Sequence, residues 1–244
     1  MSNPAEPFAT QHSGAKGVVA TRWWWVRHAP VREDGGCIYG QKDIGCDTSD
    51  RVVFEAVGKI LPRDAVWFAS SLKRTHQTAD VIWAAGFPKP SAMQHVPALA
   101  EQHLGEWQGL NRVAFLASRP IGSHWFAAID DPAPGGESFM DLYNRVRGAI
   151  ERINAEHAGK NIIAVAHGGT IKAAVGLALG NQPEKGLAFD VDNCSVTRLD
   201  HLASLEHSSW RLPAVNQQPW IADASHAAMH QPVGPEVASP TKLA

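Results

Sequence analysis

The chain has 244 residues, 44% of them hydrophobic and 19% charged, which is enough to bury the core of one globular domain. Its 22 basic and 24 acidic residues give a formal net charge of −2, and this balance predicts neither a nucleic acid nor an anionic membrane as partner. The three cysteines follow no disulfide or metal-binding pattern. We find no secretory signal and no run of roughly 18 apolar residues, so we expect a soluble, cytoplasmic protein.

The first half of the chain alternates strand and helix patterns. Residues 1–17 lack periodicity and predict a flexible N-terminal arm. The β-branched and aromatic residues of 18–26 (VVATRWWWV) predict a buried strand. After a turn-rich stretch, capping residues introduce a helix over 51–61. A second short strand over 65–69 runs into a helix that ends near Gly86.

The middle of the chain continues this alternation. Residues 92–99 predict a third strand, and one or two short helices are expected within 105–134. An apolar stripe and a following glycine predict an amphipathic helix over 137–157. The apolar run at 161–166 predicts a fourth strand, followed by an Ala-rich helix over 170–179.

Late strands are expected at 194–199 and 208–212, and residues 213–244 read as a C-terminal tail. Residues 18–212 would then form the folded domain. Alternating strands and helices predict an α/β fold of three layers, with a doubly wound, mostly parallel sheet. The late strands predict an antiparallel edge.

Polar clusters follow three of the predicted strands. They are Arg27-His28 after the first strand, 71–74 after the second, and His167-Gly168 after the fourth. The carboxyl ends of parallel strands meet at one edge of a sheet, where ligands bind. Helix N-termini and arginine side chains both favour phosphate. The chain lacks the glycine-rich loops and magnesium-binding acidic clusters of other phosphate sites, so these clusters predict a different phosphate site.

Five motifs carry a resemblance to a known family. They are V-R-H at 26–28, S-x-L-x-R-T-x-Q-T-A at 70–79, L-A-E-Q-H-L-G-E-W-Q-G at 99–109, G-G-E-S at 135–138 and A-H-G-G at 166–169. In their order and spacing they resemble the histidine phosphatase superfamily, the phosphoglycerate mutase-like proteins. The resemblance covers roughly residues 20–200 and implies a phosphoglycerate mutase-like fold.

The resemblance also implies catalytic roles for five residues. His28 matches the nucleophile that attacks phosphorus to form a phosphohistidine. Arg27 and Arg74 match the arginines that hold the phosphoryl oxygens, and His167 matches a second histidine that donates to them. Glu101 matches the acid that protonates the leaving oxygen.

Four further positions are implied to bind substrate. Gly168 matches a backbone donor, and Tyr39 and Gly40 resemble the loop that lies over the phosphate. Arg112 falls near a lysine position of the mutases. The resemblance implies no metal and no other cofactor, and it implies a small phosphorylated metabolite as the substrate. A homodimer is one of the assemblies that the superfamily allows.

Departures from the motifs favour a phosphatase over a mutase. Leu104 stands where mutases that use bisphosphoglycerate have a tyrosine, and 123–131 lacks the arginines that mutases use for the substrate carboxylate. The R-H-x-P-V and Y-G-x-x-D patterns resemble the α-ribazole phosphatase-like branch. We therefore predict a metal-independent phosphatase for a small phosphate monoester. The alternatives are a phosphoglycerate mutase and a non-catalytic protein that binds a phosphate ligand.

Overall fold

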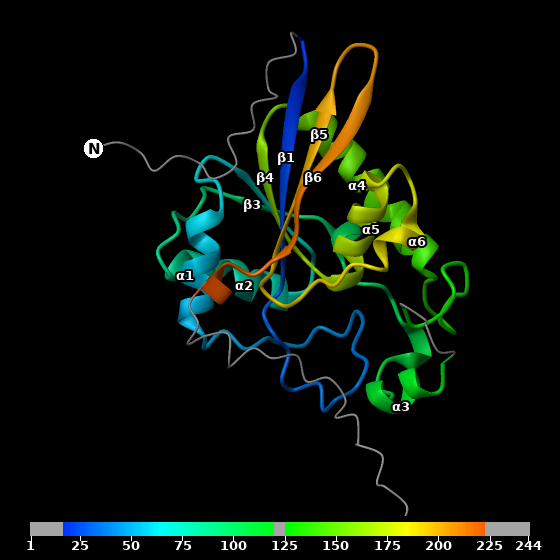
Figure 1. The fold of residues 1–244 in the computed structure, drawn as a ribbon. Helices are drawn as coiled ribbons and strands as arrows, with labels where there is room; N and C mark the ends of the chain where they lie inside the picture. The colour runs from blue at the N-terminus through cyan, green and yellow to red at the C-terminus, as the bar shows by residue number, and fades with distance from the viewer. Residues whose placement is uncertain (1–16, 120–124, 223–244) are drawn as a thin grey trace, which may run out of the picture.

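A computed structural model describes residues 17–119 and 125–222 and shows one six-stranded sheet with helices on both faces (Figure 1). The strand order is β3-β2-β4-β1-β5-β6; β1 to β4 run parallel to one another, β5 is antiparallel to β1, and β6 is antiparallel to β5. This confirms the predicted three-layer fold and its antiparallel edge. The strands are β1 (Val19–Arg27), β2 (Val66–Ala69), β3 (Met93–His95), β4 (Asn161–Ala166), β5 (Val196–Ala203) and β6 (Ser208–Gln217).

Helices α1 and α2 cover one face of the sheet, and α4 and α5 cover the other (Figure 1). The α-helices are α1 (Arg51–Ile60), α2 (Lys73–Ala84), α3 (Arg112–Ala117), α4 (Phe139–Glu156), α5 (Gly168–Ala178) and α6 (Pro183–Gly186). The short 3-10 helices are η1 (Pro97–Leu99), η2 (Gly105–Trp107) and η3 (Pro219–Ala222). Of these helices, α6, η1 and η3 had no counterpart among the predicted helices.

Three predicted strands differ from the observed ones. The strand predicted over 194–199 is β5, which begins at Val196 and continues to Ala203. The third strand was predicted over 92–99, but β3 has only three residues and the backbone turns into η1 at Pro97, because proline cannot donate to a sheet ladder. The last strand was expected to end at 212, yet β6 continues to Gln217. It does so through Pro213, which is tolerated because β6 is an edge strand.

The predicted start of the tail at residue 213 is therefore wrong, because 213–222 pack on the domain. After β6 the chain enters η3, whose Trp220 is buried in the apolar layer shared with α1. The rest of the predicted tail, from residue 223, and residues 1–16 of the predicted arm lie outside the described residues.

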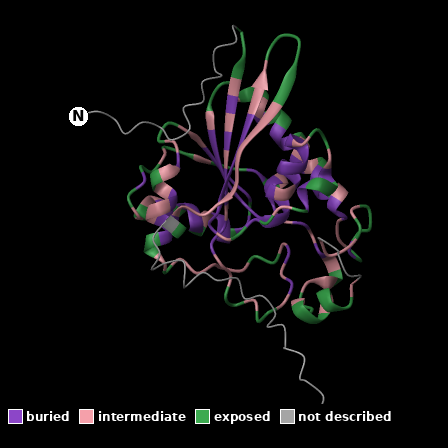
Figure 2. Ribbon diagram, in the orientation of Figure 1, coloured by how far each residue is buried: buried purple, intermediate pink, exposed green. Residues whose placement is uncertain are grey.

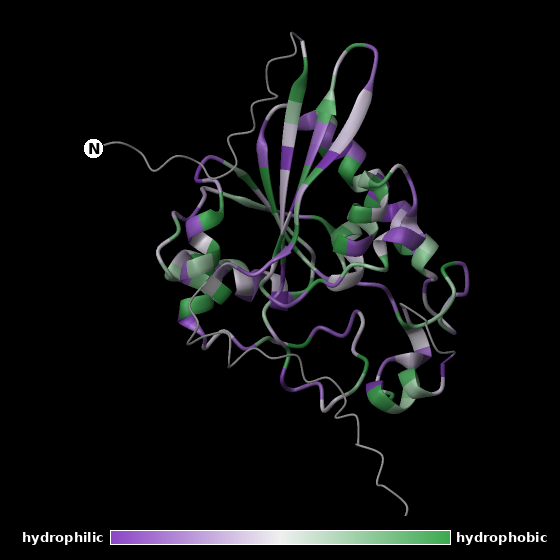
Figure 3. Ribbon diagram, in the orientation of Figure 1, coloured by the Kyte–Doolittle hydropathy of each residue, from purple (hydrophilic) through white to green (hydrophobic). Residues whose placement is uncertain are grey.

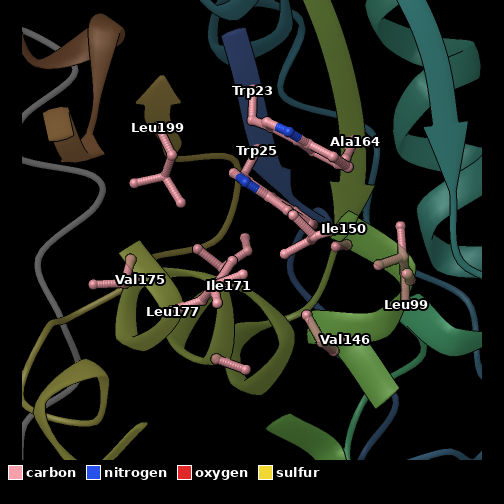
Figure 4. Close-up of a cluster of buried hydrophobic side chains, with 14 of the residues drawn as sticks. Trp23, Trp25, Leu99, Val146, Ile150, Ala164, Ile171, Val175, Leu177 and Leu199 are labelled. Atoms are coloured by element: carbon pink, nitrogen blue, oxygen red, sulfur yellow. The ribbon is translucent and has the colours of Figure 1, made fainter. Parts of the chain in front are cut away.

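The consecutive tryptophans of β1 belong to the core. Trp23 and Trp25 point to the same face, as alternate strand residues must, and are fully buried with their rings stacked 4.9 Å apart (Figure 4). They pack in the cluster formed with α4 and α5. Trp24 points to the opposite face, where the Arg198 guanidinium lies 4.7 Å from its ring. The structure thus confirms the strand predicted for this segment, with Trp23 and Trp25 in the core.

Burial is uneven along the sheet. The strands are buried where helices cover them, whereas the tip of the β5–β6 hairpin is exposed (Figure 2). The short helix α3 stands away from the sheet and is largely exposed, although it carries apolar residues such as Val113 and Leu116 (Figures 2 and 3).

None of the helices in 17–119 and 125–222 combines the length and the apolar composition required to cross a membrane.

Candidate active site

The predicted site residues meet at the carboxyl edge of the parallel strands. Strand β4 lies between β1 and β2, so the segments that follow these three strands are neighbours. Arg27 ends β1, Ser70 follows β2, and His167 follows β4. The His28 and His167 rings lie 5.2 Å apart between centroids, and both residues are almost completely buried. The sheet therefore brings together two clusters that are about 140 residues apart in the sequence.

One ring nitrogen of His28 forms a hydrogen bond to the main chain, whereas the other makes no hydrogen bond to a described residue. Its Nδ1 lies 2.7 Å from the carbonyl oxygen of Ala29, and because a carbonyl can only accept, Nδ1 carries the proton. Nε2 then holds the lone pair. Burial, with the positive charges of Arg27 and Arg74, lowers the pKa of His28 well below its ordinary value. A neutral imidazole with a free Nε2 is the form that can act as a nucleophile.

Arg74 is fixed by main-chain carbonyls rather than by a carboxylate. Located in the first turn of α2, it is fully buried. Its Nη1 donates to the oxygen of Lys42 at 2.9 Å and its Nη2 to the oxygen of Gly40 at 2.7 Å. Burial lowers the pKa of Arg74, but an arginine remains charged at neutral pH. Gly40, predicted to contact substrate, therefore orients Arg74 through its carbonyl.

His167 is the residue directly before α5, where its side chain makes no capping hydrogen bond, and it is fully buried. Its Nε2 lies 2.7 Å from the hydroxyl oxygen of Ser70. Burial, followed by the charge of Arg74 and by His28, lowers the pKa of His167 well below its ordinary value. Sequence reasoning assigned no role to Ser70, although this residue stands within the motif that leads to Arg74. Its position at the end of β2 was the available signal.

Three buried nitrogens of this cluster have no protein partner. They are Nε of Arg27, Nε of Arg74 and Nδ1 of His167. An unpaired buried donor costs free energy, and a charged one costs more. A phosphoryl group would bring three strong acceptor oxygens to such donors. The donor set therefore fits a phosphoryl group.

Glu101 lies close to Arg27 at the start of α5. Its Oε1 accepts from the backbone N–H of Gln102 at 2.9 Å, and its Oε2 accepts from that of Gly169 at 3.3 Å. A side chain at Gly168 would lie 3.6 Å from Nε of Arg27 and 3.9 Å from Oε2 of Glu101. Gly168 thus occupies the position between the two, and the five predicted catalytic residues form one group.

Arg145, which sequence reasoning missed, holds the segment that carries Glu101. Its guanidinium makes two bonds to the Glu137 carboxylate, at 2.7 and 2.9 Å, and its Nη2 also donates to the main-chain oxygen of Glu101 at 2.8 Å. Burial is the largest single influence on the pKa of Glu137 and raises it, but the hydrogen bonds from Arg145 and from the His103 backbone N–H, together with the positive charge of Arg145, outweigh burial and lower the pKa. A charged residue beside the apolar stripe of α4 was the sequence signal for this contact.

The remaining predicted residues lie at the margin. The Tyr39 ring is 6.4 Å from that of His28, and the Arg74 guanidinium lies 5.1 Å from its centroid. Arg112 is paired with Asp34 and donates to the oxygen of Cys37 at 2.8 Å. Its guanidinium is 5.6 Å from the Tyr39 ring. Substrate contacts of Tyr39 and Arg112 stay predictions.

This fold, with paired histidines and arginines at the carboxyl edge, is the arrangement expected of a histidine phosphatase. A model of the histidine phosphatase superfamily (branch 1) matches residues 23–218. The chain therefore belongs to the histidine phosphatase superfamily, whose members include phosphatases and phosphoglycerate mutases.

Relatives of both kinds are similar to this chain. It is 30% identical over 180 residues to 2,3-bisphosphoglycerate-dependent phosphoglycerate mutase 2 of Gloeobacter violaceus, covering 71% of this chain and 82% of that one. It is 29% identical over 181 residues to a metal-independent phosphoserine phosphatase of Arabidopsis thaliana, covering 73% and 67%. The structure of a mycobacterial glucosyl-3-phosphoglycerate phosphatase aligns with a TM-score of 0.68 at 26% identity, covering 81% and 99%.

Proposed function

We propose that this protein is a metal-independent phosphatase that hydrolyses a small phosphate monoester through a phosphohistidine on His28. The observation that carries the proposal is the set of buried nitrogens without a protein partner around His28, which are Nε of Arg27, Nε of Arg74 and Nδ1 of His167. Nδ1 of a neutral His167 carries its proton when Nε2 accepts from the Ser70 hydroxyl. These nitrogens offer positive charge and N–H groups to one phosphoryl group. The similarity to phosphatases supports the reaction class.

In the first step, the Nε2 lone pair of His28 attacks phosphorus and the bond from phosphorus to the ester oxygen breaks. Arg27, Arg74 and His167 stabilise the charge on the three phosphoryl oxygens. Glu101, in its protonated form, gives its proton to the leaving oxygen, so the alcohol departs neutral. The products of this step are the free alcohol, phosphorylated His28 and ionised Glu101.

In the second step, ionised Glu101 takes a proton from a water molecule as that water attacks phosphorus. The bond from phosphorus to Nε2 breaks, and its electron pair returns to the ring of His28. Inorganic phosphate leaves, and Glu101 is again protonated. No step requires a metal, because the arginines supply the positive charge.

The free thiols of the described cysteines fit the reducing cytoplasm that we propose as the compartment.

Hydrolysis of p-nitrophenyl phosphate with a chelator present tests the proposal. We expect turnover by the wild type, an acid-labile phosphoenzyme after rapid quench, and loss of both in His28→Ala. The control is His207→Ala, at an exposed position of the β5–β6 hairpin. Unchanged turnover in His28→Ala would refute the nucleophile. A wild type that binds phosphate but hydrolyses no member of an ester panel, α-ribazole 5′-phosphate included, would favour a binding protein.

The similarity to a phosphoglycerate mutase makes phosphoryl transfer the second candidate. In a mutase, an alcohol of the substrate replaces water in the second step. Incubation with 3-phosphoglycerate and catalytic 2,3-bisphosphoglycerate distinguishes the two functions. Formation of 2-phosphoglycerate faster than release of phosphate would favour the mutase.

A further inference from the structure

The side of the site that would receive the leaving group carries a cation to which no role has been assigned. Lys172 stands on α5 four residues after Gly168, so the two residues share one face of the helix. Gly168 lies beside Arg27 and Glu101. Lys172 is therefore one helical turn away from the groups that would hold and protonate the ester.

Trp125 forms the wall between Lys172 and Glu101. A side chain on Gly169 would lie 2.4 Å from Oε1 of Glu101 and 3.2 Å from Cζ2 of Trp125, so the carboxylate and the indole flank the same backbone atom. The indole is fixed because its Nε1 donates to Oε1 of Gln102 at 2.6 Å. The Lys172 ammonium lies 5.6 Å from the ring centroid. A rigid aromatic surface thus leads from the acid to the cation.

Lys172 forms no direct ion pair within 17–119 and 125–222, and the carboxylates of Asp190 and Glu101 attract it only at longer range. Its Nζ donates to the main-chain oxygen of Leu187 at 2.8 Å, and an ammonium has three donors. The residue is partly buried, and burial lowers its pKa. A partly desolvated ammonium with donors to spare favours an anion brought by a ligand.

We propose that Lys172, with Trp125, binds a carboxylate on the leaving group, so that the preferred substrates are phosphate monoesters of hydroxy acids. This proposal rests on the proposed function, because Glu101 marks the leaving-group side only if it protonates that group. One ammonium matches the single charge of a carboxylate. The indole excludes water on one side of the pair, which strengthens the charge-assisted hydrogen bond.

Two esters that differ in one group test the proposal. 3-Phosphoglycerate carries a carboxylate where glycerol 3-phosphate carries a hydroxymethyl group. We expect the wild type to prefer 3-phosphoglycerate, mainly through KM. Lys172→Met should lower kcat/KM for 3-phosphoglycerate by about ten- to hundredfold, the usual worth of a charge-assisted bond, and change it less than threefold for glycerol 3-phosphate. Lys172→Arg should retain most of the preference.

Lys185→Met is the matched control, since Lys185 is an exposed lysine on neighbouring α6, and it should change neither ester. An equal loss on both esters in Lys172→Met, or no loss, would overturn the proposal and leave the phosphatase function intact. A wild type that releases phosphate from no ester would instead overturn the proposed function. Calorimetry on His28→Ala then decides the binding question: 3-phosphoglycerate should bind more tightly than glycerol 3-phosphate, and Lys172→Met should abolish the difference. Equal binding of the two esters would overturn the inference.

Discussion

Gly169→Ala should disable the proposed acid while leaving the fold intact. A methyl group at this position would lie 2.4 Å from Oε1 of Glu101, 3.0 Å from Cδ2 of Leu142 and 3.2 Å from Cζ2 of Trp125. The carboxylate has to move at least 0.6 Å before its separation from the methyl group reaches 3.0 Å. Leu142 and Trp125 are both fixed in the packing of α4, so the carboxylate is the group that yields.

The expected loss follows from what the carboxylate does. A general acid contributes about 10²- to 10⁴-fold to a rate, and a misplacement of ~1 Å in an active site can cost about 10²-fold. We therefore expect kcat to fall about hundredfold, or about 2.7 kcal/mol in activation free energy. The loss should be greater for alkyl phosphates than for p-nitrophenyl phosphate, because p-nitrophenolate leaves without much help from an acid.

Steady-state phosphate release on both kinds of ester measures this effect. Gly148→Ala is the control: it lies within α4, and a methyl group there would meet no atom within 4 Å. It should leave kcat unchanged and raise the free energy of unfolding by up to about 1 kcal/mol. If Gly169→Ala keeps its rate on alkyl phosphates within threefold, or loses the same factor on both esters, Glu101 does not act as the acid from this position.

Three further predictions concern the residues around the phosphoryl position. The pKa of His28 and that of His167 lie well below the ordinary value, so below about pH 6.5 the unfolded chain takes up protons that the folded chain does not. As the pH falls below about 6.5, each histidine should therefore lower the free energy of unfolding by up to about 1.4 kcal/mol per pH unit. Urea titrations at pH 7.0 and 5.5 should show a smaller fall in His28→Ala than in the wild type. Ser70→Ala should lower kcat/KM about tenfold with little change in unfolding, and 15N NMR of the His167 ring should show a changed tautomer balance; an unchanged ring signal would contradict this role. Arg145→Lys cannot reproduce the forked contact with Glu137, so thermal and urea unfolding should show a loss of about 2–3 kcal/mol, whereas an unchanged midpoint would mean that the contact adds nothing.

The sequence predicted most of the regular elements because their patterns were local. The strand predicted over 161–166 coincides with β4, since a short apolar run between polar ends has few other interpretations. Helix α1 begins after Asp50, whose side chain accepts from the Val53 N–H as predicted for a capping residue. The end of β6 could not be predicted in this way. Pro213 usually ends a strand, and only the place of β6 at the sheet edge allows it to continue.

The site was predictable only as far as its motifs reached. Motif residues such as His28 were named in advance, because their identity and spacing carry the signal. The other residues make contacts that are distant in the sequence. Ser70 contacts His167, 97 residues away. Arg145 contacts Glu101, 44 residues away, and Lys172 contacts Leu187, 15 residues away. Such contacts depend on the packing of α4 and α5 against the strand ends, and no local pattern encodes them.

The way the arginines are held explains how a chain of net charge −2 can offer a positive site. Neither Arg27 nor Arg74 forms an ion pair with a described carboxylate. Main-chain oxygens of Val191, Gly40 and Lys42 orient them instead. A carbonyl dipole fixes a guanidinium without cancelling its charge, whereas a paired carboxylate would compete with the phosphoryl oxygens. The fold thus keeps two cations, a fully buried Arg74 and a partly buried Arg27, without a directly paired carboxylate. Under the proposed function, the charge of the phosphoryl group would complete the site, which is the condition for strong electrostatic stabilisation of its transfer.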